Sequence, residues 1–238
     1  MKGNVTIDHL LKINIMDVLP EATLARLAGA TPMIPVTRGE TILQPGTVTS
    51  SIYMLKEGRV RLYVVSSDGR EFTLGLLGPG NMFGEIQAFT LMPPDAYAVA
   101  VEDSVLCALR RDDLDQLVHE HPELGLRMIE VLSQRLWDSE QRLQQLALAD
   151  VRTRLGNLLL RLAVEFGQPE SGTWVRLDAN LTQQDLATMV GATRESVTNV
   201  LSQFARQGLA ETGRKIIRIK PDEMRAFLEE TYGSPPSI

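Results

Sequence analysis

The stretch Thr182–Phe204, TQQDLATMVGATRESVTNVLSQF, has the pattern of two short helices joined by a tight turn. Thr182 is followed three residues later by Asp185, and this pair is typical of a helix N-terminus because a threonine hydroxyl there accepts a hydrogen bond from the main chain. The first helix is therefore predicted to begin after Thr182. Gly191 can adopt the left-handed conformation that often ends a helix, and Thr193 can cap the next one.

The second helix of this stretch should have two chemically different faces. The apolar side chains that recur at helical spacing, and are expected to be buried, are Val197, Val200, Leu201 and Phe204. The side chains left toward solvent are Arg194, Glu195, Thr198, Asn199 and Ser202. Ala187 is small enough to let the two helices cross closely. The arrangement resembles the helix-turn-helix of bacterial transcription factors, although an ordinary helical hairpin has a similar pattern.

Length and composition limit what the chain can be. Its 238 residues are enough for two domains. No apolar run is long enough to span a bilayer, and the N-terminal segment lacks a hydrophobic signal core, so the sequence predicts a soluble cytoplasmic protein. The single cysteine, Cys107, excludes an internal disulfide, and its place in a predicted strand favours a core residue over a reactive thiol. The histidines His9, His119 and His121 do not have the spacing of a metal site.

Charge is distributed unevenly along the chain. The formal net charge is −6, yet residues 1–151 carry 13 Lys and Arg against 20 Asp and Glu, whereas residues 152–238 carry 11 against 10. From Arg194 to Lys220 there are six basic and two acidic side chains. The positive charge is thus concentrated in and after the two-helix stretch, where a phosphate backbone could be bound.

The first half of the chain changes from a helical to a strand pattern. Residues 7–28 are amphipathic, with a break at Pro20, and are predicted to be helical. From Met33 the apolar period is two, and short strand-like runs alternate with turn residues. The last runs lie in residues 96–109. Many short strands with glycine turns predict a small antiparallel barrel or roll.

The longest helical pattern begins after Pro122. Apolar or small residues follow one another at alternating spacings of three and four, at Ile129, Leu132, Leu136, Ser139, Leu143 and Leu146. This is the a/d seam of a coiled coil over roughly three heptads. Because so narrow a strip suits a second helix, we predict a parallel homodimer in which the same helix of another subunit occupies it. The alternative is a helix that packs only against its own domain.

The seam stops at Ala149, and Asp150 is placed to cap a new helix. The sequence therefore predicts three parts, with boundaries at residues 1–121, 122–149 and 150–238. In the last part, a loop over residues 167–172 should precede a short strand around Val175 and Leu177. After the two-helix stretch, residues 209–219 have the pattern of a hairpin that would form a wing.

Taken in order, these parts resemble the Crp/Fnr family of bacterial transcription regulators. The segments that carry the resemblance are EGRVRLY (57–63), SSDGREFTL (66–74), GPGNMFGE (78–85), DVRTRLGNLLLRLA (150–163) and LTQQDLATMVGATRESVTNVLSQF (181–204). The resemblance implies an α+β fold with an N-terminal antiparallel β-roll like a cyclic-nucleotide-binding domain, a long dimerisation helix and a C-terminal winged helix-turn-helix. It also implies a homodimer that binds a palindromic DNA site, with half-sites about 34 Å apart.

The resemblance places the DNA contacts on and around the second helix of the motif. Arg194 and Glu195 match the family's base-reading pair, in which arginine donates to guanine and glutamate accepts from cytosine, and they predict a half-site resembling GTGA. Asn199 stands where the cyclic-AMP-binding members have arginine, so the preferred site should differ there. Thr198 lies on the same predicted face. The positions that match phosphate-binding residues are Thr182, Thr193, Ser196 and Lys215.

The resemblance also identifies a possible effector pocket. Its positions are Gly84, Glu85, Asp95, Ala96, Ser139 and Glu140. Gly84 and Glu85 keep the family's ribose-binding pair, but Asp95 and Ala96 replace its phosphate-binding Arg-Ser pair, and an acid there would repel a phosphate. We therefore expect that cyclic AMP is not the effector. Either the pocket takes another small molecule, for which the acids would favour a cationic or hydroxyl-rich one, or the chain is active without a ligand.

These residues fit three classes of function unequally. The leading hypothesis is a sequence-specific transcription regulator that contacts or blocks RNA polymerase. The alternative is a ligand-sensing signalling module whose C-terminal helices contact a protein partner. An enzyme comes third, because no nucleophile, metal cluster or phosphate loop accompanies Glu85, Asp95 or Glu140. No cofactor is predicted: haem occurs in some relatives, but this sequence has no obvious pair of axial ligands near the pocket.

Overall fold

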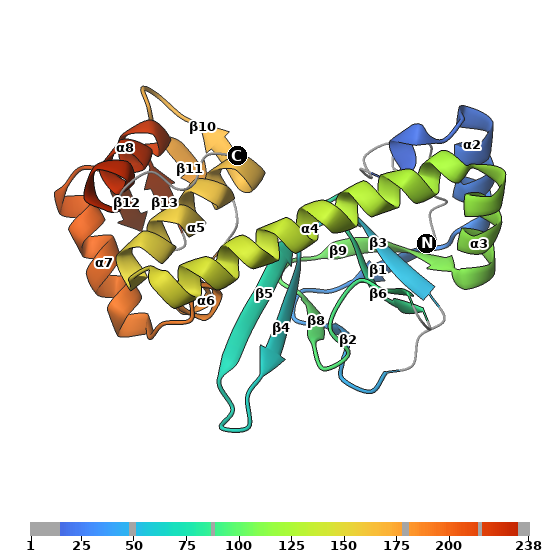
Figure 1. The fold of residues 1–238 in the computed structure, drawn as a ribbon, viewed down its shortest axis with the longest axis horizontal. Helices are drawn as coiled ribbons and strands as arrows, with labels where there is room; N and C mark the ends of the chain where they lie inside the picture. Colours follow the sequence, from blue (N-terminus) through green and yellow to red (C-terminus); the bar gives the residue numbers. More distant parts are fainter. Residues whose placement is uncertain (1–14, 48–50, 87–88, 178–180, 214–215, 233–238) are drawn as a thin grey trace. The chain divides into compact units, whose positions relative to one another are not determined.

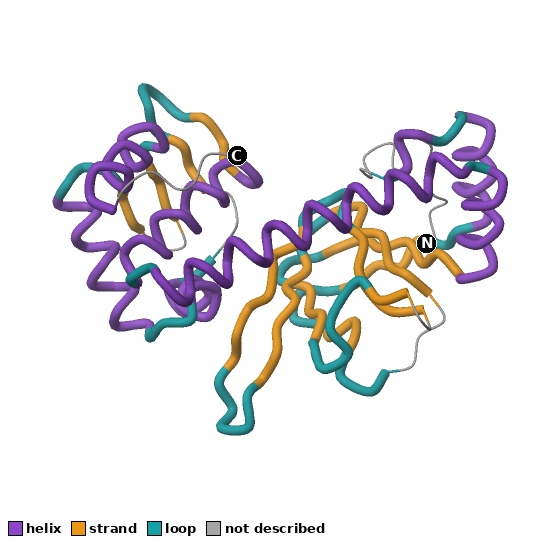
Figure 2. The backbone as a smooth tube through the Cα atoms, in the orientation of Figure 1, coloured by secondary structure: helices purple, strands orange, loops and turns teal. Residues whose placement is uncertain are grey.

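The computed structural model describes residues 15–47, 51–86, 89–177, 181–213 and 216–232. The chain divides into two compact units, Met1–Trp137 and Asp138–Ile238. Figure 2 shows that strands form most of the body of the first unit, whereas helices surround a few short strands in the second. The predicted boundaries at residues 121 and 149 remain predictions, because the long helix that they delimit contributes residues to both units.

A membrane-spanning helix is absent from the described part of the chain, since none of its helices is both long and apolar enough.

Helices cover the beginning and the end of the roll. A short 3-10 helix η1 (Met16–Val18) and helix α2 (Glu21–Ala30) are separated at Leu19 and Pro20, as the break at Pro20 predicted. The earlier part of the predicted amphipathic segment, residues 7–14, lies outside the described residues. Helix α3 (Arg111–Glu120) follows the roll and was not predicted. Its first turn contains Asp112 and Asp113, which suit the positive end of a helix dipole.

The predicted antiparallel roll is confirmed (Figure 1). Its strands are β1 (Met33–Val36), β2 (Thr41–Leu43), β3 (Ser51–Glu57), β4 (Val60–Val65), β5 (Glu71–Leu77), β6 (Met82–Ile86), β7 (Phe89–Thr90), β8 (Tyr97–Ala100) and β9 (Ser104–Arg110). They form one sheet in the order β1-β9-β3-β6-β7 and a second in the order β2-β8-β4-β5. A cluster of buried apolar side chains that includes Leu55, Phe83 and Leu106 is contributed by both sheets and neighbouring segments.

Three residues of the roll, a glycine, a lysine and the cysteine, are constrained by close packing or burial. Gly58 has φ 82° between β3 and β4, and a Cβ atom there would lie 2.6 Å from the carbonyl oxygen of Asp103, so only glycine fits. Lys56 is only 2% exposed, and burial lowers the pKa of its ammonium group to about 8. Cys107 is fully buried, which agrees with the predicted core role, and burial raises the pKa of its thiol.

The described residues of the second unit include the end of the long helix, which is followed by shorter helices. These helices are α4 (Pro122–Leu148), α5 (Val151–Phe166), α6 (Gln183–Val190), α7 (Arg194–Arg206) and α8 (Pro221–Tyr232). The strands are β10 (Gly167–Pro169), β11 (Val175–Leu177), β12 (Ala210–Gly213) and β13 (Ile216–Ile219), in the sheet order β10-β11-β13-β12. The predicted cap of α5 is confirmed, because Asp150 accepts a hydrogen bond from the main-chain N of Thr153 at 2.8 Å.

Two elements of this unit differ from the sequence-based expectation. The segment predicted as a loop over residues 167–172 begins with β10, which pairs antiparallel with β11. Gly167 is required there, since a Cβ atom would lie 2.1 Å from the carbonyl oxygen of Ala163. Helix α8 was also not predicted, although Pro221 at its first position and two acids in its first turn are a usual start signal.

Helix α4 leaves much of its predicted seam uncovered. Ile129, Leu136 and Leu143 are 60%, 62% and 70% exposed, and Leu146 is 41% exposed. Leu132, by contrast, is only partly exposed. A large apolar stripe on a folded chain costs free energy unless a partner covers it.

Candidate nucleic-acid interface

The start of α6 is fixed by the capping pair that the sequence predicted. The main-chain N of Asp185 donates to Oγ1 of Thr182 at 3.1 Å, and the main-chain N of Thr182 donates to Oδ2 of Asp185 at 2.8 Å. Both partners of a capping box are therefore present. The Thr182 hydroxyl also donates to the same carboxylate at 2.7 Å, so a contact from Thr182 to a phosphate would require its hydroxyl or its main-chain N–H to leave Asp185.

A left-handed glycine sets the angle between α6 and α7. Gly191 has φ 63° and ψ 47°, and the main-chain N of Ala192 donates to the carbonyl oxygen of Ala187 at 3.0 Å. Ala187 is fully buried, as expected at a close crossing of the two helices. The turn therefore closes in the manner that the sequence predicted for a helix-turn-helix.

Helix α7 separates an apolar face from a polar one. Val197, Val200, Leu201 and Phe204 are buried, with exposures between 0% and 8%. Arg194, Glu195 and Asn199 are exposed on the other side. Thr193 caps the helix by accepting from the main-chain N of Ser196 at 3.2 Å, and their hydroxyls lie 3.0 Å apart.

Thr198 lies on this face but has partners within the protein. Its hydroxyl is 2.7 Å from Oε1 of Gln183 and 2.8 Å from the carbonyl oxygen of Arg194. A hydroxyl has one proton, and both of these atoms are acceptors. The Thr198 hydroxyl can therefore contact a group outside the protein mainly as a hydrogen-bond acceptor, through its lone pairs.

Helices α5 and α8 support α7 from behind (Figure 1). Arg152 of α5 is hydrogen-bonded to Gln203 of α7. Phe204 lies edge-on to Phe227 of α8, with 6.2 Å between ring centroids. Position 156 of α5 is glycine because a Cβ atom there would lie 2.8 Å from Leu228. The exposed face of α7 is thus presented by a helix that packs against α5 and α8.

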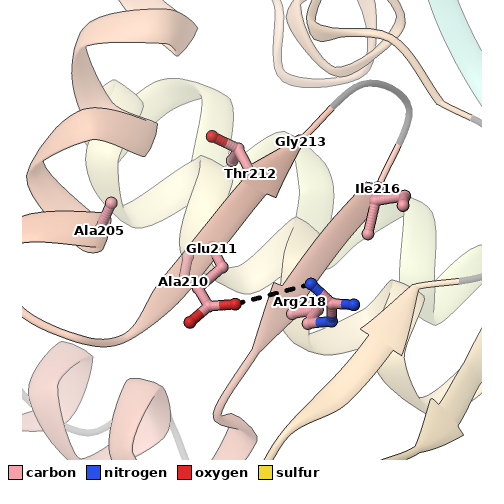
Figure 3. A pocket seen from close by; sticks show the side chains of 7 residues that line it. All are labelled: Ala205, Ala210, Glu211, Thr212, Gly213, Ile216 and Arg218. Carbon is pink, nitrogen blue, oxygen red and sulfur yellow. Dashed lines mark ion pairs between the residues drawn. The ribbon is translucent and has the colours of Figure 1, made fainter.

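The wing follows directly after α7. Strands β12 and β13 pair from Ala210 with Ile219 to Gly213 with Ile216. Lys215, one of the predicted phosphate-binding residues, lies outside the described residues. A hollow of about 400 Å³ lies beside the end of α7 and the wing (Figure 3). Its lining residues are Ala205, Ala210, Glu211, Thr212, Gly213, Ile216 and Arg218.

The wing's basic charge is partly neutralised by acids. Nε of Arg218 lies 2.7 Å from Oε2 of Glu170, and its Nη1 lies 3.7 Å from Oε2 of Glu211, the pair drawn in Figure 3. Arg176 lies 3.5 Å from the other oxygen of Glu170. The simple count of basic residues after Arg194 therefore overstates the positive charge that the wing presents. Sequence reasoning missed this because Glu170 follows the unpredicted strand β10.

The predicted effector positions fall in both units. Gly84 is buried with φ 112°, and its carbonyl oxygen accepts from the main-chain N of Leu91 at 2.9 Å. The backbone of Glu85 pairs with Thr90, but its side chain lies outside what the structure describes. Asp95 is exposed. The remaining effector positions are Ala96, which is 1% exposed in the core of the roll, and Ser139 and Glu140, which are exposed on α4.

Arg135 is a residue near these positions that the sequence did not single out. Its Nη2 donates to the carbonyl oxygen of Met82 at 2.8 Å, and its Nη1 lies 3.5 Å from that of Leu91. These carbonyls flank Gly84 along the chain. Burial lowers the pKa of the Arg135 guanidinium. The sequence feature that could have identified Arg135 is a basic residue directly beside the apolar seam of α4.

Metal binding has no support in the part of the chain that the structure describes, where no three His, Cys, Asp or Glu side chains come together.

The architecture defines a class of protein, a winged helix-turn-helix regulator with a cyclic-nucleotide-binding-like roll. Residues 33–121 match the family model of the cyclic nucleotide-binding domain, and residues 153–227 match that of the Crp-like helix-turn-helix domain. The chain belongs to the Crp/Fnr family of bacterial transcription regulators.

Relatives with described functions support this assignment. The chain is 30% identical to a CRP-like cAMP-activated global transcriptional regulator of Mycobacterium tuberculosis, over 91% of this chain and 96% of that one. It is 32% identical to a global nitrogen regulator of Synechocystis, over 84% and 91%. A solved CRP/FNR-family regulator from Thermus thermophilus has 31% identity, a TM-score of 0.69 and coverage of 84% and 100%.

Proposed function

We propose that the protein is a homodimeric, sequence-specific transcription regulator that inserts α7 of each subunit into the major groove of a palindromic, GTGA-like site. The observation that carries this proposal is the polar face of α7. Arg194, Glu195 and Asn199 are exposed there, while the opposite face is buried. Thr193 caps the N-terminus of the helix. A helix held in this way can enter a groove without rearrangement.

The exposed side chains have the chemistry for reading bases. Arg194 can donate twice to O6 and N7 of guanine, and Glu195 can accept from the amino group of cytosine. Asn199 suits adenine. Ser196, with the caps Thr182 and Thr193, and Lys215 are proposed to contact phosphates, which fixes register without selecting sequence.

Dimerisation through α4 explains its exposed stripe. Ile129, Leu136 and Leu143 are seven residues apart, and all are at least 60% exposed. Identical helices with a heptad stripe can cover one another around a two-fold axis. The dimer would also match the two-fold symmetry of a palindromic site, as other members of this family do.

The dimer can be tested by sedimentation equilibrium of the full chain. Leu136→Asp should give a monomer, because it places a charge in the proposed seam. Val164→Asp is the matched control, since Val164 is an exposed apolar residue, at 84%, on α5 rather than on the helix that carries the seam. A wild-type monomer at micromolar concentration, or a Leu136→Asp dimer as tight as wild type, would contradict the proposal.

The effector is proposed to differ from cyclic AMP, or to be unnecessary. The pair that holds a cyclic phosphate in the family is replaced by Asp95, an exposed acid, and Ala96, a buried residue without a polar side-chain atom. We make this proposal although the M. tuberculosis relative is described as cAMP-activated. Isothermal titration calorimetry that detected micromolar cyclic AMP binding would overturn it.

Selection of bound DNA from a random pool, with and without cell extract, tests the function as a whole. We expect an inverted repeat with GTGA-like arms. RNA polymerase is the proposed partner on DNA, and no enzymatic activity is proposed because the relatives are regulators.

One observation favours a second candidate, a signalling module whose C-terminal domain binds a protein. The wing arginine Arg218 is paired with Glu170 and Glu211 rather than left for phosphate. Weak binding that is almost independent of DNA sequence at physiological salt would favour this candidate.

A further inference from the structure

The heptad pattern of α4 places charged residues beside the seam. With Ile129, Leu136 and Leu143 at position a, the g positions are Met128, Arg135 and Arg142, and the e positions are Ser133, Glu140 and Ala147. In a parallel coiled coil, a g residue lies beside the e residue of the following heptad on the other helix, five residues further along. Met128 then faces serine and Arg142 faces alanine. Only Arg135 faces a residue of opposite charge, Glu140 of the second copy.

We propose that Arg135 of each protomer forms an ion pair with Glu140 of the other protomer, and that this pair fixes the parallel register of the dimer. It rests on the homodimer of the proposed function. Two-fold symmetry gives two such pairs per dimer. Each would connect the roll of one protomer to the dimer helix of the other, since Arg135 is bound to the roll.

The Arg135 side of the pair is already ordered. Its two terminal nitrogens reach the carbonyl oxygens of Met82 and Leu91, at 2.8 and 3.5 Å. These contacts hold the planar, positively charged guanidinium in place, and a carboxylate is the partner that such a group prefers. Little side-chain entropy would then be lost when the carboxylate of a second copy arrives.

The carboxylate of Glu140 is accessible to a partner. The side chain is exposed and forms no ion pair within the described residues. The residues three and four positions away on the helix are Leu136, Trp137, Leu143 and Gln144, so its own helical turn supplies no base. A second copy of α4 is therefore the source of positive charge that the heptad geometry offers.

A rotated pairing of the two helices makes the opposite prediction. If the e positions Ser133, Glu140 and Ala147 lay at the centre of the seam, the two copies of Glu140 would face each other. Like charges there would weaken the dimer. Neutralising Glu140 would then tighten the dimer, whereas it should weaken the dimer if Arg135 is the partner.

The experiment is sedimentation equilibrium of the full chain carrying Glu140→Gln or Glu140→Lys. We expect Glu140→Gln to raise the dimer Kd about fivefold, and Glu140→Lys to raise it further because it faces Arg135 with a like charge. The effect of Glu140→Gln should shrink as salt rises, since salt screens exposed pairs. Glu130→Gln is the matched control: Glu130 is an acid of α4 that pairs within its own helix, with Arg127 at 2.9 Å, and its loss should leave the Kd unchanged.

A double-mutant cycle assigns the effect to the pair. In an Arg135→Gln background, Glu140→Gln should have little further effect, and if Arg135→Gln fails to fold, the two Glu140 variants still decide the question. A dimer that is unchanged or tightened by Glu140→Gln overturns the pair while leaving the homodimer in place. A wild-type monomer would overturn the homodimer and the pair together, so the two failures are distinguishable.

Discussion

Charged side chains have opposite environments in the first unit and on the exposed face of helix α7. In the first unit, Lys56 of β3 is 2% exposed, and Arg135 of α4 is held by the main-chain carbonyls of Met82 and Leu91. On α7, Arg194 and Glu195 are exposed. Removing a charge from water costs free energy that the surrounding structure must offset, whereas an exposed charge has no such cost.

The difference indicates where each unit can respond to its surroundings. The buried charge of Lys56 is coupled to the folding of the roll, and the stability of the roll should therefore depend on pH. Charges on α7 contribute little to folding and remain accessible to a ligand, which is what recognition of DNA requires.

The largest effect is expected where α7 is attached to its support. Phe204→Ala should lower the free energy of unfolding of the second unit by about 3–5 kcal/mol, because it leaves a cavity in place of a fully buried ring. Urea unfolding followed by circular dichroism measures it. Ser202→Ala is the control on the exposed face and should change stability by less than about 0.5 kcal/mol. Equal effects of the two would contradict the division of α7 into two faces.

Lys56 tests the buried charge of the roll through pH. Its pKa is about 8 when folded and 10.5 as an ordinary lysine, so between these values the unfolded chain binds more protons. The free energy of unfolding should therefore rise as pH increases from about 8 to 10.5, with a contribution on the order of 3 kcal/mol. Below pH 8 both states are protonated and the contribution is constant. Lys56→Met should remove this rise; an identical pH profile in the variant would exclude Lys56 as its cause.

The second unit was largely predictable from sequence because its signals are local. Thr182 with Asp185, Gly191 and Asp150 each act within a few residues of the chain, and the structure contains the caps and the turn that they predicted. The same holds for the strand pattern of the roll. Strand β10 was missed because Gly167 and Pro169 have no strand pattern, and its pairing with β11 is made by the main chain.

Long-range charge pairs could not be predicted in this way. Glu170 and Arg218 are 48 residues apart, and only the folded sheet brings them within 2.7 Å. Arg135 and the Met82 carbonyl are 53 residues apart. The base-reading and effector roles of the named residues still rest on the family resemblance, because exposure alone does not identify a ligand.

Arg194→Ala tests the exposed charge of α7. It should weaken binding to the selected DNA site by about 1–3 kcal/mol and relax the preference at one base pair, because a bidentate contact to guanine is lost. Fluorescence anisotropy with matched and mismatched duplexes measures both changes. Arg225→Ala is the control, since Arg225 of α8 is paired with Asp222 at 3.0 Å. Equally tight and selective binding by Arg194→Ala would remove α7 from the proposed interface.

The smallest effect is expected at the wing, where exposed charge is opposed by an acid. Glu211 is more than half exposed and lies 3.7 Å from Arg218, so a phosphate near this arginine would meet a carboxylate as well. Glu211→Gln should strengthen DNA binding by less than about 1 kcal/mol, equally for specific and random duplexes, because phosphate contacts do not select sequence. Glu229→Gln, at an exposed position of α8, removes the same charge elsewhere and controls for the change in net charge. Weaker binding by Glu211→Gln would mean that the acid helps to position the wing, and the surface charges of this unit would then be as structurally committed as those of the roll.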